Sequence, residues 1–297
     1  IDWMFNFGKV TAQVDLQYEN NAAGQNDNEV EQAFVNYDLG NGLSVTAGRY
    51  ESSLGLEAKE PTGLYQYSTA YDMGNADNNV DNGKGGVDIL PQYAQGVKLT
   101  KVSGDNVYSV SIQDEAFEND GGRLGGDKNG TGGNSSYAVE AAASIALGDG
   151  MTWFLGGAYE DSDSADNNTY VLNTHLVVES GDLTWGAEVN YGDAEGGFTN
   201  GLNQGADSNE EVLQALIMAN YAYSDCCSVT GRISYSDHEN EVGGVDGEAD
   251  FLKYTLAHNY AVTDNLAVIT EVSLVDGEIN DVDYEALVGA VEVLFTF

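Results

Sequence analysis

The chain has 297 residues, and its 37 glycines and 18 tyrosines with only 2 prolines suit long paired strands joined by turns rather than helices. The formal net charge of −39 excludes a nucleic-acid-binding protein, which needs a basic surface, and it attracts cations. No apolar run of about 18 residues is present, so no transmembrane helix is expected. The start at Ile1-Asp2-Trp3 is what we expect of an exported chain whose signal peptide has been removed.

A period of two runs along most of the chain. In residues 10–18, Val10 and Val14 point to one face of a strand, while Thr11 and Asp15 point to the other. The alternation repeats and predicts fourteen strands, at residues 10–18, 33–39, 43–47, 97–99, 108–112, 137–147, 153–159, 170–178, 183–191, 213–221, 229–235, 252–256, 266–274 and 287–297.

The connections between these strands alternate in length. Short Gly/Asn/Asp turns of hairpin type lie at 40–42, 103–105, 148–150, 180–182, 224–226 and 262–265. Longer acidic segments lie at 20–28, 51–92, 114–135, 160–167, 193–209, 237–249 and 276–282. This alternation predicts a structure with tight turns at one end and long loops at the other, as in outer-membrane barrels with periplasmic turns and extracellular loops.

The two strand faces differ in a way that favours a membrane. The apolar face is nearly free of charge, whereas the polar face is rich in Ser, Thr, Asn, Gln and Gly. A soluble sandwich would carry charged side chains outward, and only a closed barrel satisfies every backbone group of a sheet in lipid. We therefore predict an all-β fold, a single domain over residues 1–297 that forms a transmembrane antiparallel up-and-down β-barrel. It has about 14 strands, or 16 if segment 51–92 hides another hairpin.

Two segments carry a family resemblance. Residues 287–297 look like the terminal strand of bacterial outer-membrane proteins, and Phe297 matches the terminal Phe read by the barrel-insertion machinery. Residues 48–51, 54–57 and 60–65 are similar to part of the putative β-barrel porin-2 (OmpL-like) family. The resemblance implies a Gram-negative outer-membrane porin that lies among lipid and lipopolysaccharide, forms a homotrimer and passes small hydrophilic solutes. The alternative is a plugged structural or adhesive barrel whose acidic loops bind cations or partners.

In porins an early long loop folds into the barrel and narrows it, and the resemblance implies the same for segment 51–92. A solvated surface loop is the alternative reading of this segment. The predicted pore-lining and constriction residues are Arg49, Glu51, Glu57, Lys59, Glu60, Lys98, Glu140, Glu188, Arg232, Glu271 and Glu292. Acids exceed bases on the predicted lumen face, which predicts a preference for cations. Strand phase points Arg49 outward, so it lies above the bilayer or is turned inward by a bulge at Gly48.

Acidic loops could hold hard cations. Asp161, Asp163 and Asp166 offer three carboxylates at short spacing for Ca²⁺ or Mg²⁺, and residues 276–283 hold a second acidic cluster. Solvated acidic loops without a bound ion are the simpler reading of both. No other cofactor is expected.

Reactive side chains give no sign of an enzyme, because no nucleophile motif accompanies His175, His238 or His258. The adjacent Cys226 and Cys227 lie in a predicted periplasmic turn, where a strained vicinal disulfide and two free thiols both remain open.

Overall fold

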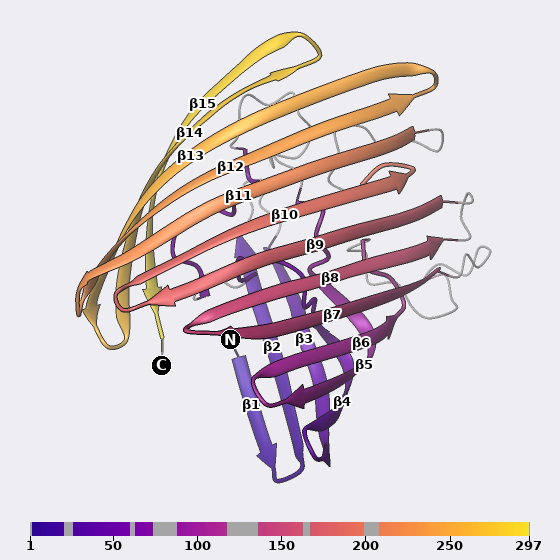
Figure 1. The fold of residues 1–297 in the computed structure, drawn as a ribbon, viewed down its shortest axis with the longest axis vertical. Helices are drawn as coiled ribbons and strands as arrows, with labels where there is room; N and C mark the ends of the chain where they lie inside the picture. The colour runs from indigo at the N-terminus through magenta and orange to yellow at the C-terminus, as the bar shows by residue number, and fades with distance from the viewer. Residues whose placement is uncertain are drawn as a thin grey trace. The chain divides into compact units, whose positions relative to one another are not determined.

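The computed structural model describes residues 2–20, 26–59, 63–73, 88–117, 136–162, 167–198 and 208–296. These residues form one antiparallel sheet in which every strand pairs with its neighbours in sequence (Figure 1). The strands are β1 (Asp2–Phe7), β2 (Val10–Asn20), β3 (Asn26–Gly40), β4 (Leu43–Glu51), β5 (Tyr93–Ser103), β6 (Asn106–Gln113), β7 (Ser136–Gly148), β8 (Met151–Ser162), β9 (Asn167–Ser180), β10 (Leu183–Glu195), β11 (Ser208–Ser224), β12 (Cys227–Val242), β13 (Val245–Thr263), β14 (Leu266–Ile279) and β15 (Val282–Phe295). No helix in the described part of the chain is long and apolar enough to cross a membrane.

All fourteen predicted strands are present as β2 to β15, and β1 is the addition. The sequence analysis missed β1 because Met4 interrupts the polar face formed by Asp2 and Asn6, and because only the two-residue turn Gly8-Lys9 separates it from β2. The fifteen strands fall between the predicted numbers of 14 and 16. The described residues between Glu51 and Tyr93 contain no further hairpin.

The predicted short turns are confirmed, and their backbone explains their sequence. Asn41 and Gly42 both have positive φ, 55° and 72°, as do Asp149 and Gly150, at 52° and 75°. Positive φ at both central residues matches the twist of a two-residue hairpin. A Cβ added at Gly42 would lie 2.3 Å from the Val102 carbonyl oxygen, so no other residue fits there.

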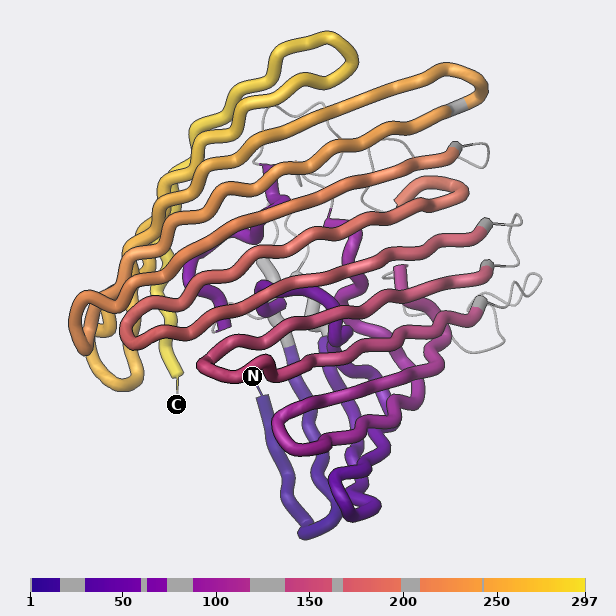
Figure 2. Tube along the Cα trace, viewed as in Figure 1, coloured from indigo at the N-terminus to yellow at the C-terminus, as the bar shows by residue number. Residues whose placement is uncertain are grey.

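Two of the predicted long loops are wrong. Segment 237–249 consists mostly of β12 and β13, which are joined by Gly243-Gly244. Segment 276–282 likewise consists of the end of β14, the turn Asn280-Asp281 and the first residue of β15. The strands remain paired beyond the point where apolar and polar residues stop alternating in the sequence. A strand needs no apolar face where both of its faces contact water. Figure 2 shows these long hairpins from β11 to β15 running side by side.

The chain divides into two compact units by its internal contacts. Unit 1 comprises residues 1–54, 91–145 and 156–168, and unit 2 comprises residues 55–90, 146–155 and 169–297.

The strands bury their polar side chains and expose their apolar ones. In β12 of unit 2, Arg232 and Ser234 are 2% and 0% exposed, whereas Ile233 between them is 45% exposed. Unit 1 repeats this in β7, where Glu140 is buried and Tyr137 is exposed. Water-soluble domains do the reverse, and exposed apolar faces of this extent suit contact with lipid hydrocarbon.

Candidate channel constriction

The chain that follows β4 lies against the polar face of the sheet. We call residues 52–59 and 63–73 the wall-bound segment. Its first three residues belong to unit 1 and the remainder to unit 2.

In unit 1 the segment is anchored on one carboxylate. The Ser52 hydroxyl donates to Glu140 Oε2 at 2.6 Å, and the Ser53 backbone N–H donates to Glu140 Oε1 at 2.9 Å. The Leu54 backbone N–H then donates to Ser52 Oγ at 3.1 Å. Glu140 is supplied by β7 and is buried. Neutral donors therefore hold a single buried acid here.

A lysine lies in the same unit as this anchor. Lys98 of β5 donates to the Glu51 carbonyl oxygen at 3.4 Å, and its Nζ lies 4.5 Å from the centre of the Tyr50 ring. Tyr50 is buried on the polar face of β4, where the ring face attracts the ammonium group.

In unit 2 the segment first meets β9 and β10. The Gly55 N–H donates to Asn173 Oδ1 at 3.2 Å, and the Leu56 N–H donates to Glu188 Oε1 at 2.6 Å. The Tyr71 hydroxyl reaches the other Glu188 oxygen at 3.2 Å. Burial, with the nearby Glu188 carboxylate, raises the pKa of Tyr71 well above its ordinary value, so the hydroxyl stays a donor. A Cβ added at Gly186 would lie 2.9 Å from Leu56 Cδ2, so this glycine permits the close approach.

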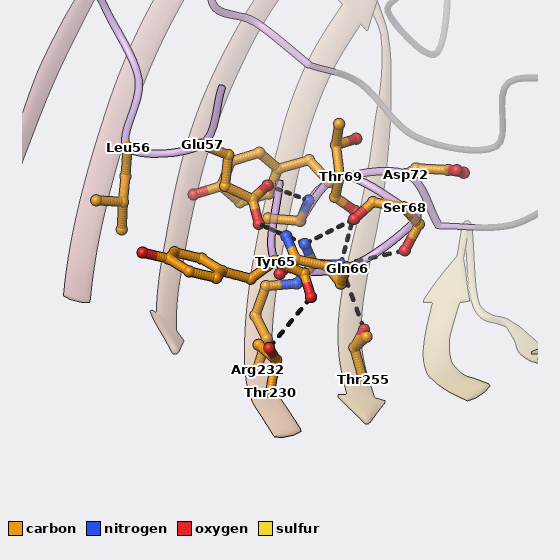
Figure 3. Close-up of polar contacts among 12 residues, drawn as sticks. Leu56, Glu57, Tyr65, Gln66, Ser68, Thr69, Asp72, Thr230, Arg232 and Thr255 are labelled. Carbon is orange, nitrogen blue, oxygen red and sulfur yellow. Dashed lines mark hydrogen bonds and ion pairs between the residues drawn. The ribbon is translucent and has the colours of Figure 1, made fainter. Parts of the chain in front are cut away.

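Arg232 of β12 is the centre of the next contacts (Figure 3). Its guanidinium forms an ion pair with Glu57 and donates to the carbonyl oxygens of Ser68 at 2.8 Å and Thr69 at 3.0 Å. Glu57 also accepts from the Ala70 backbone N–H at 2.7 Å. A buried arginine with five donors in a planar fork suits this combination of carboxylate and carbonyl partners.

The two following strands add one cation and one carboxylate. Lys253 of β13 donates to Ser68 Oγ at 2.9 Å, to the Thr69 carbonyl at 3.0 Å and to the Asp72 carbonyl. Glu271 of β14 accepts from the Ser68 hydroxyl at 2.5 Å and from its backbone N–H at 3.0 Å. Ser68 is thereby bound from both strands.

Apolar side chains complete the contact in unit 2. Ala70, Tyr71 and Met73 are buried in a cluster with side chains of the strands, namely Leu216, Met218, Ala249, Phe251 and Val275. The Tyr284 hydroxyl of β15 donates to the Met73 carbonyl at 3.0 Å. The segment is thus both hydrogen bonded and packed against the sheet.

The structure brings most of the predicted pore residues to the wall-bound segment. In unit 2 these are Glu57, Glu188, Arg232 and Glu271, and in unit 1 it is Glu140. Lys98 binds the carbonyl of Glu51, the residue directly before the segment. Lys59 is itself part of the segment and pairs with Asp88 at 3.6 Å, whereas Glu292 is half-buried on β15. Glu60 lies outside the described residues.

Arg49 shares the strand face of Ala47, opposite Tyr50, and donates to the Glu31 carbonyl at 3.1 Å. The hypothesised bulge at Gly48 is absent from the pairing of β3 with β4, which shifts only between Asp38 and Gly40.

Sequence reasoning missed Lys253. Lys253 lies between the apolar residues Leu252 and Tyr254, so the alternation of the strand places it on the polar face. This position could have been predicted from the sequence. It was hidden because Phe251 and Ala257 make that face of β13 look apolar.

The predicted acidic clusters are only partly described. Asp161 lies in β8, whereas Asp163 and Asp166 fall outside the described residues, as does Phe297. Ligand atoms of Glu248, Glu278 and Asp281 lie within 4.8 Å of one another. Glu278 and Asp281 belong to the second predicted cluster, and the neighbouring strand β13 supplies Glu248, which linear spacing could not reveal.

Comparison with known proteins gives one family and several structures. The family model described as putative beta-barrel porin-2, OmpL-like, matches residues 4–297. No curated protein matches the chain. The outer membrane channel DcaP of Acinetobacter baumannii is 12% identical, with a TM-score of 0.67 over 100% of this chain and 83% of that chain.

Two further solved structures share the fold. An anion-selective porin from Comamonas acidovorans is 12% identical, with a TM-score of 0.58 over 98% of this chain and 84% of that one. The trimer form of OmpT from Vibrio cholerae is 12% identical, with a TM-score of 0.57 over 98% and 88%. At these identities the likeness shows the fold alone, and it confirms the up-and-down barrel class predicted from the sequence.

Proposed function

This chain belongs to the putative beta-barrel porin-2 (OmpL-like) family, and we propose that its channel in the outer membrane passes small hydrophilic solutes and favours cations. Membership of a porin family supports a channel protein rather than an enzyme. The preference for cations rests on one observation. Among the described residues, eight Asp and Glu side chains are buried but only two Lys and Arg side chains, Arg232 and Lys253.

Charge on the pore wall, rather than the fold, sets the sign of this selectivity. The Comamonas porin is anion-selective, although its fold is similar. Channels select ions by the charged side chains that line them, and a surplus of carboxylates raises the local concentration of cations. Glu140, Glu188 and Glu271, which hold the wall-bound segment, belong to this surplus.

Reversal potentials in planar bilayers under a KCl gradient test the proposal. We expect the reversal potential of the unaltered protein to have the sign that K⁺ permeation gives. The reversal potential of Glu188→Gln should have the same sign and a smaller magnitude. Glu179→Gln, at an exposed position beside a turn, is the matched control and should leave the potential unchanged. A potential of the opposite sign for the unaltered protein would overturn the cation preference.

We further propose that the wall-bound segment narrows the bore. Its contacts with Glu140 in unit 1, and with Glu188, Arg232, Lys253 and Glu271 in unit 2, come from the polar sheet face. In a porin barrel this face surrounds the water-filled lumen. Deleting residues 65–72 should raise the single-channel conductance, whereas a segment outside the bore would leave it unchanged.

A homotrimer is the proposed assembly, because the OmpT structure from Vibrio cholerae is described as a trimer form. Chemical cross-linking of the detergent-solubilised protein should give a band at three times the monomer mass. A single monomer band at all cross-linker concentrations would contradict it.

The second candidate function is a plugged structural barrel whose acidic loops bind cations or partners. Burial favours this alternative, since Arg232 and Glu271 are only 2% and 7% exposed beneath the wall-bound segment. Single-channel recording separates the two functions. Discrete conductance steps support the porin, and a barrel that inserts without conducting supports the plug.

A further inference from the structure

The turn between β11 and β12 carries an uncommon set of reactive side chains. Cys226 and Cys227 are neighbours in sequence, Cys226 is exposed and Cys227 is half-exposed, and neither is in a disulfide. Their Sγ atoms are 3.2 Å apart, and Ser224 Oγ lies 3.6 Å from the Cys226 Sγ. In a disulfide the two sulfurs are about 2.05 Å apart, so these thiols are already close, and joining them forms a strained vicinal bond.

A tyrosine and a histidine lie beside these thiols. The Tyr223 hydroxyl is hydrogen bonded to His258 Nε2 at 2.7 Å. Hydrogen bonds with Cys226, Ser224 and Tyr223 lower the pKa of the Cys227 thiol. When His258 Nε2 carries its proton, it donates to the Tyr223 oxygen and leaves the tyrosine proton for the Cys227 sulfur. Hydrogen bonds of this kind stabilise a thiolate, which is the nucleophile in thiol–disulfide exchange.

We propose that Cys226 and Cys227 form a redox-active dithiol that reacts with disulfides on the periplasmic side of the membrane. Short turns of outer-membrane barrels face the periplasm, an oxidising compartment in which disulfides persist. Tyr223 and His258 are positioning residues that favour the thiolate of Cys227. The substrate is an accessible disulfide, R–S–S–R′, and the product is a vicinal disulfide in the turn.

The reaction has two exchanges. The Cys227 thiolate attacks one sulfur of R–S–S–R′, forms a mixed disulfide and releases RS⁻, which takes up the proton that Cys227 lost. The Cys226 thiolate then attacks the Cys227 sulfur, so that the vicinal bond forms and R′S⁻ leaves with the proton from Cys226. The two cysteines lose two electrons and two protons in total, and R–S–S–R′ gains them.

Peptide mass spectrometry of the folded full-length protein tests the product. The reduced protein in detergent is mixed with oxidised glutathione, acid-quenched and alkylated. We expect the Cys226–Cys227 peptide to be unalkylated and about 2 Da lighter than the dithiol, from the loss of two hydrogens. Cys226→Ser should stop at a glutathione adduct on Cys227. Alkylation of both cysteines, or cross-links between chains alone, would refute the vicinal product.

The role of Tyr223 has its own control. Tyr223→Phe removes only the hydroxyl and should slow the exchange several-fold without changing the final yield of disulfide. Tyr221→Phe alters a similarly exposed tyrosine two residues away and should not change the rate. Equal rates in the two variants would eliminate the positioning role. Channel conductance should survive in Cys227→Ser, so failure of this proposal leaves the porin proposal intact.

Discussion

The wall-bound segment is held by different chemistry at its start and in its middle. In unit 1, Glu140 accepts hydrogen bonds from Ser52 and Ser53, which are neutral donors. In unit 2, Arg232 and Lys253 donate to backbone carbonyls, and Arg232 is also paired with Glu57. Loss of a hydrogen bond from a neutral donor costs little, whereas removal of the arginine leaves the Glu57 carboxylate beside no cationic partner in a buried site. The middle of the segment should therefore be far more sensitive to substitution than its start.

The largest effect is expected for Arg232→Met. The variant leaves Glu57 without its cationic partner and the Ser68 carbonyl without the Arg232 donor, while Lys253 still donates to the Thr69 carbonyl. Breaking a buried pair from one side costs about 3–5 kcal/mol in free energy of unfolding. Urea unfolding in lipid vesicles, followed by tryptophan fluorescence, measures this loss. Lys101→Met removes a positive charge at an exposed position and is the matched control.

Single-channel recording sharpens the same prediction. Release of the segment in Arg232→Met should raise the conductance, and Lys101→Met should not. If Arg232→Met and Lys101→Met had the same free energy of unfolding, the Arg232 contacts would contribute no more to stability than an exposed charge does.

A smaller effect is expected for Lys253→Met, because Arg232 still binds Ser68 and Thr69. Loss of hydrogen bonds from a charged donor should lower the free energy of unfolding by about 1.5–3 kcal/mol. The variant also removes one of the two buried cations among the described residues, so the reversal potential should move further toward that of K⁺. A shift toward Cl⁻ would show that Lys253 does not act on permeating ions through its charge.

Glu140→Gln should have a milder effect on stability. The amide oxygen can still accept from either Ser52 or Ser53, so the free energy of unfolding should fall by only about 0.5–1.5 kcal/mol. The loss of one buried negative charge should reduce the cation preference. If Glu140→Gln destabilises the protein as strongly as Arg232→Met, the proposed contrast between the two regions fails.

The fold was predictable because it depends on a period of two. Any strand with one face in lipid and one face in a polar environment must alternate, and β2 to β15 do so. The pattern fails where the environment no longer differs between faces. For that reason the strand parts of segment 237–249, which carry Glu239 and Glu241, show no strand pattern in the sequence.

The candidate site was predictable only on its strand side. The alternation of residues along each strand was sufficient to assign four residues to the polar face, namely Glu140, Glu188, Arg232 and Glu271. Their partners on the wall-bound segment are mostly backbone groups, such as the carbonyls of Ser68 and Thr69, which every residue type has. The path of an irregular segment has no periodicity, so nothing in the sequence could pair Arg232 with Ser68 across more than 160 positions.

The smallest effect is expected at Arg49, and it tests whether strand phase decides which charges act on ions. Arg49 lies on the Ala47 face and bonds to the Glu31 carbonyl, with its guanidinium 5.8 Å from the centre of the Tyr93 ring. Lys98 lies on the other face of the sheet, the polar face, where it contacts Tyr50. Arg49→Met and Lys98→Met each remove one positive side chain, and the two side chains lie on opposite faces of the sheet.

We expect the reversal potential of Arg49→Met to match that of the unaltered protein, since the membrane-facing side of the sheet is separated from the bore by the strand itself. Lys98→Met should raise the cation preference, because it removes a positive charge near Glu51 and Glu140. A shift of equal size in both variants would mean that Arg49 reaches the permeating ions despite its phase. The assignment of buried and exposed faces to bore and lipid would then be wrong at β4, the strand that leads into the wall-bound segment.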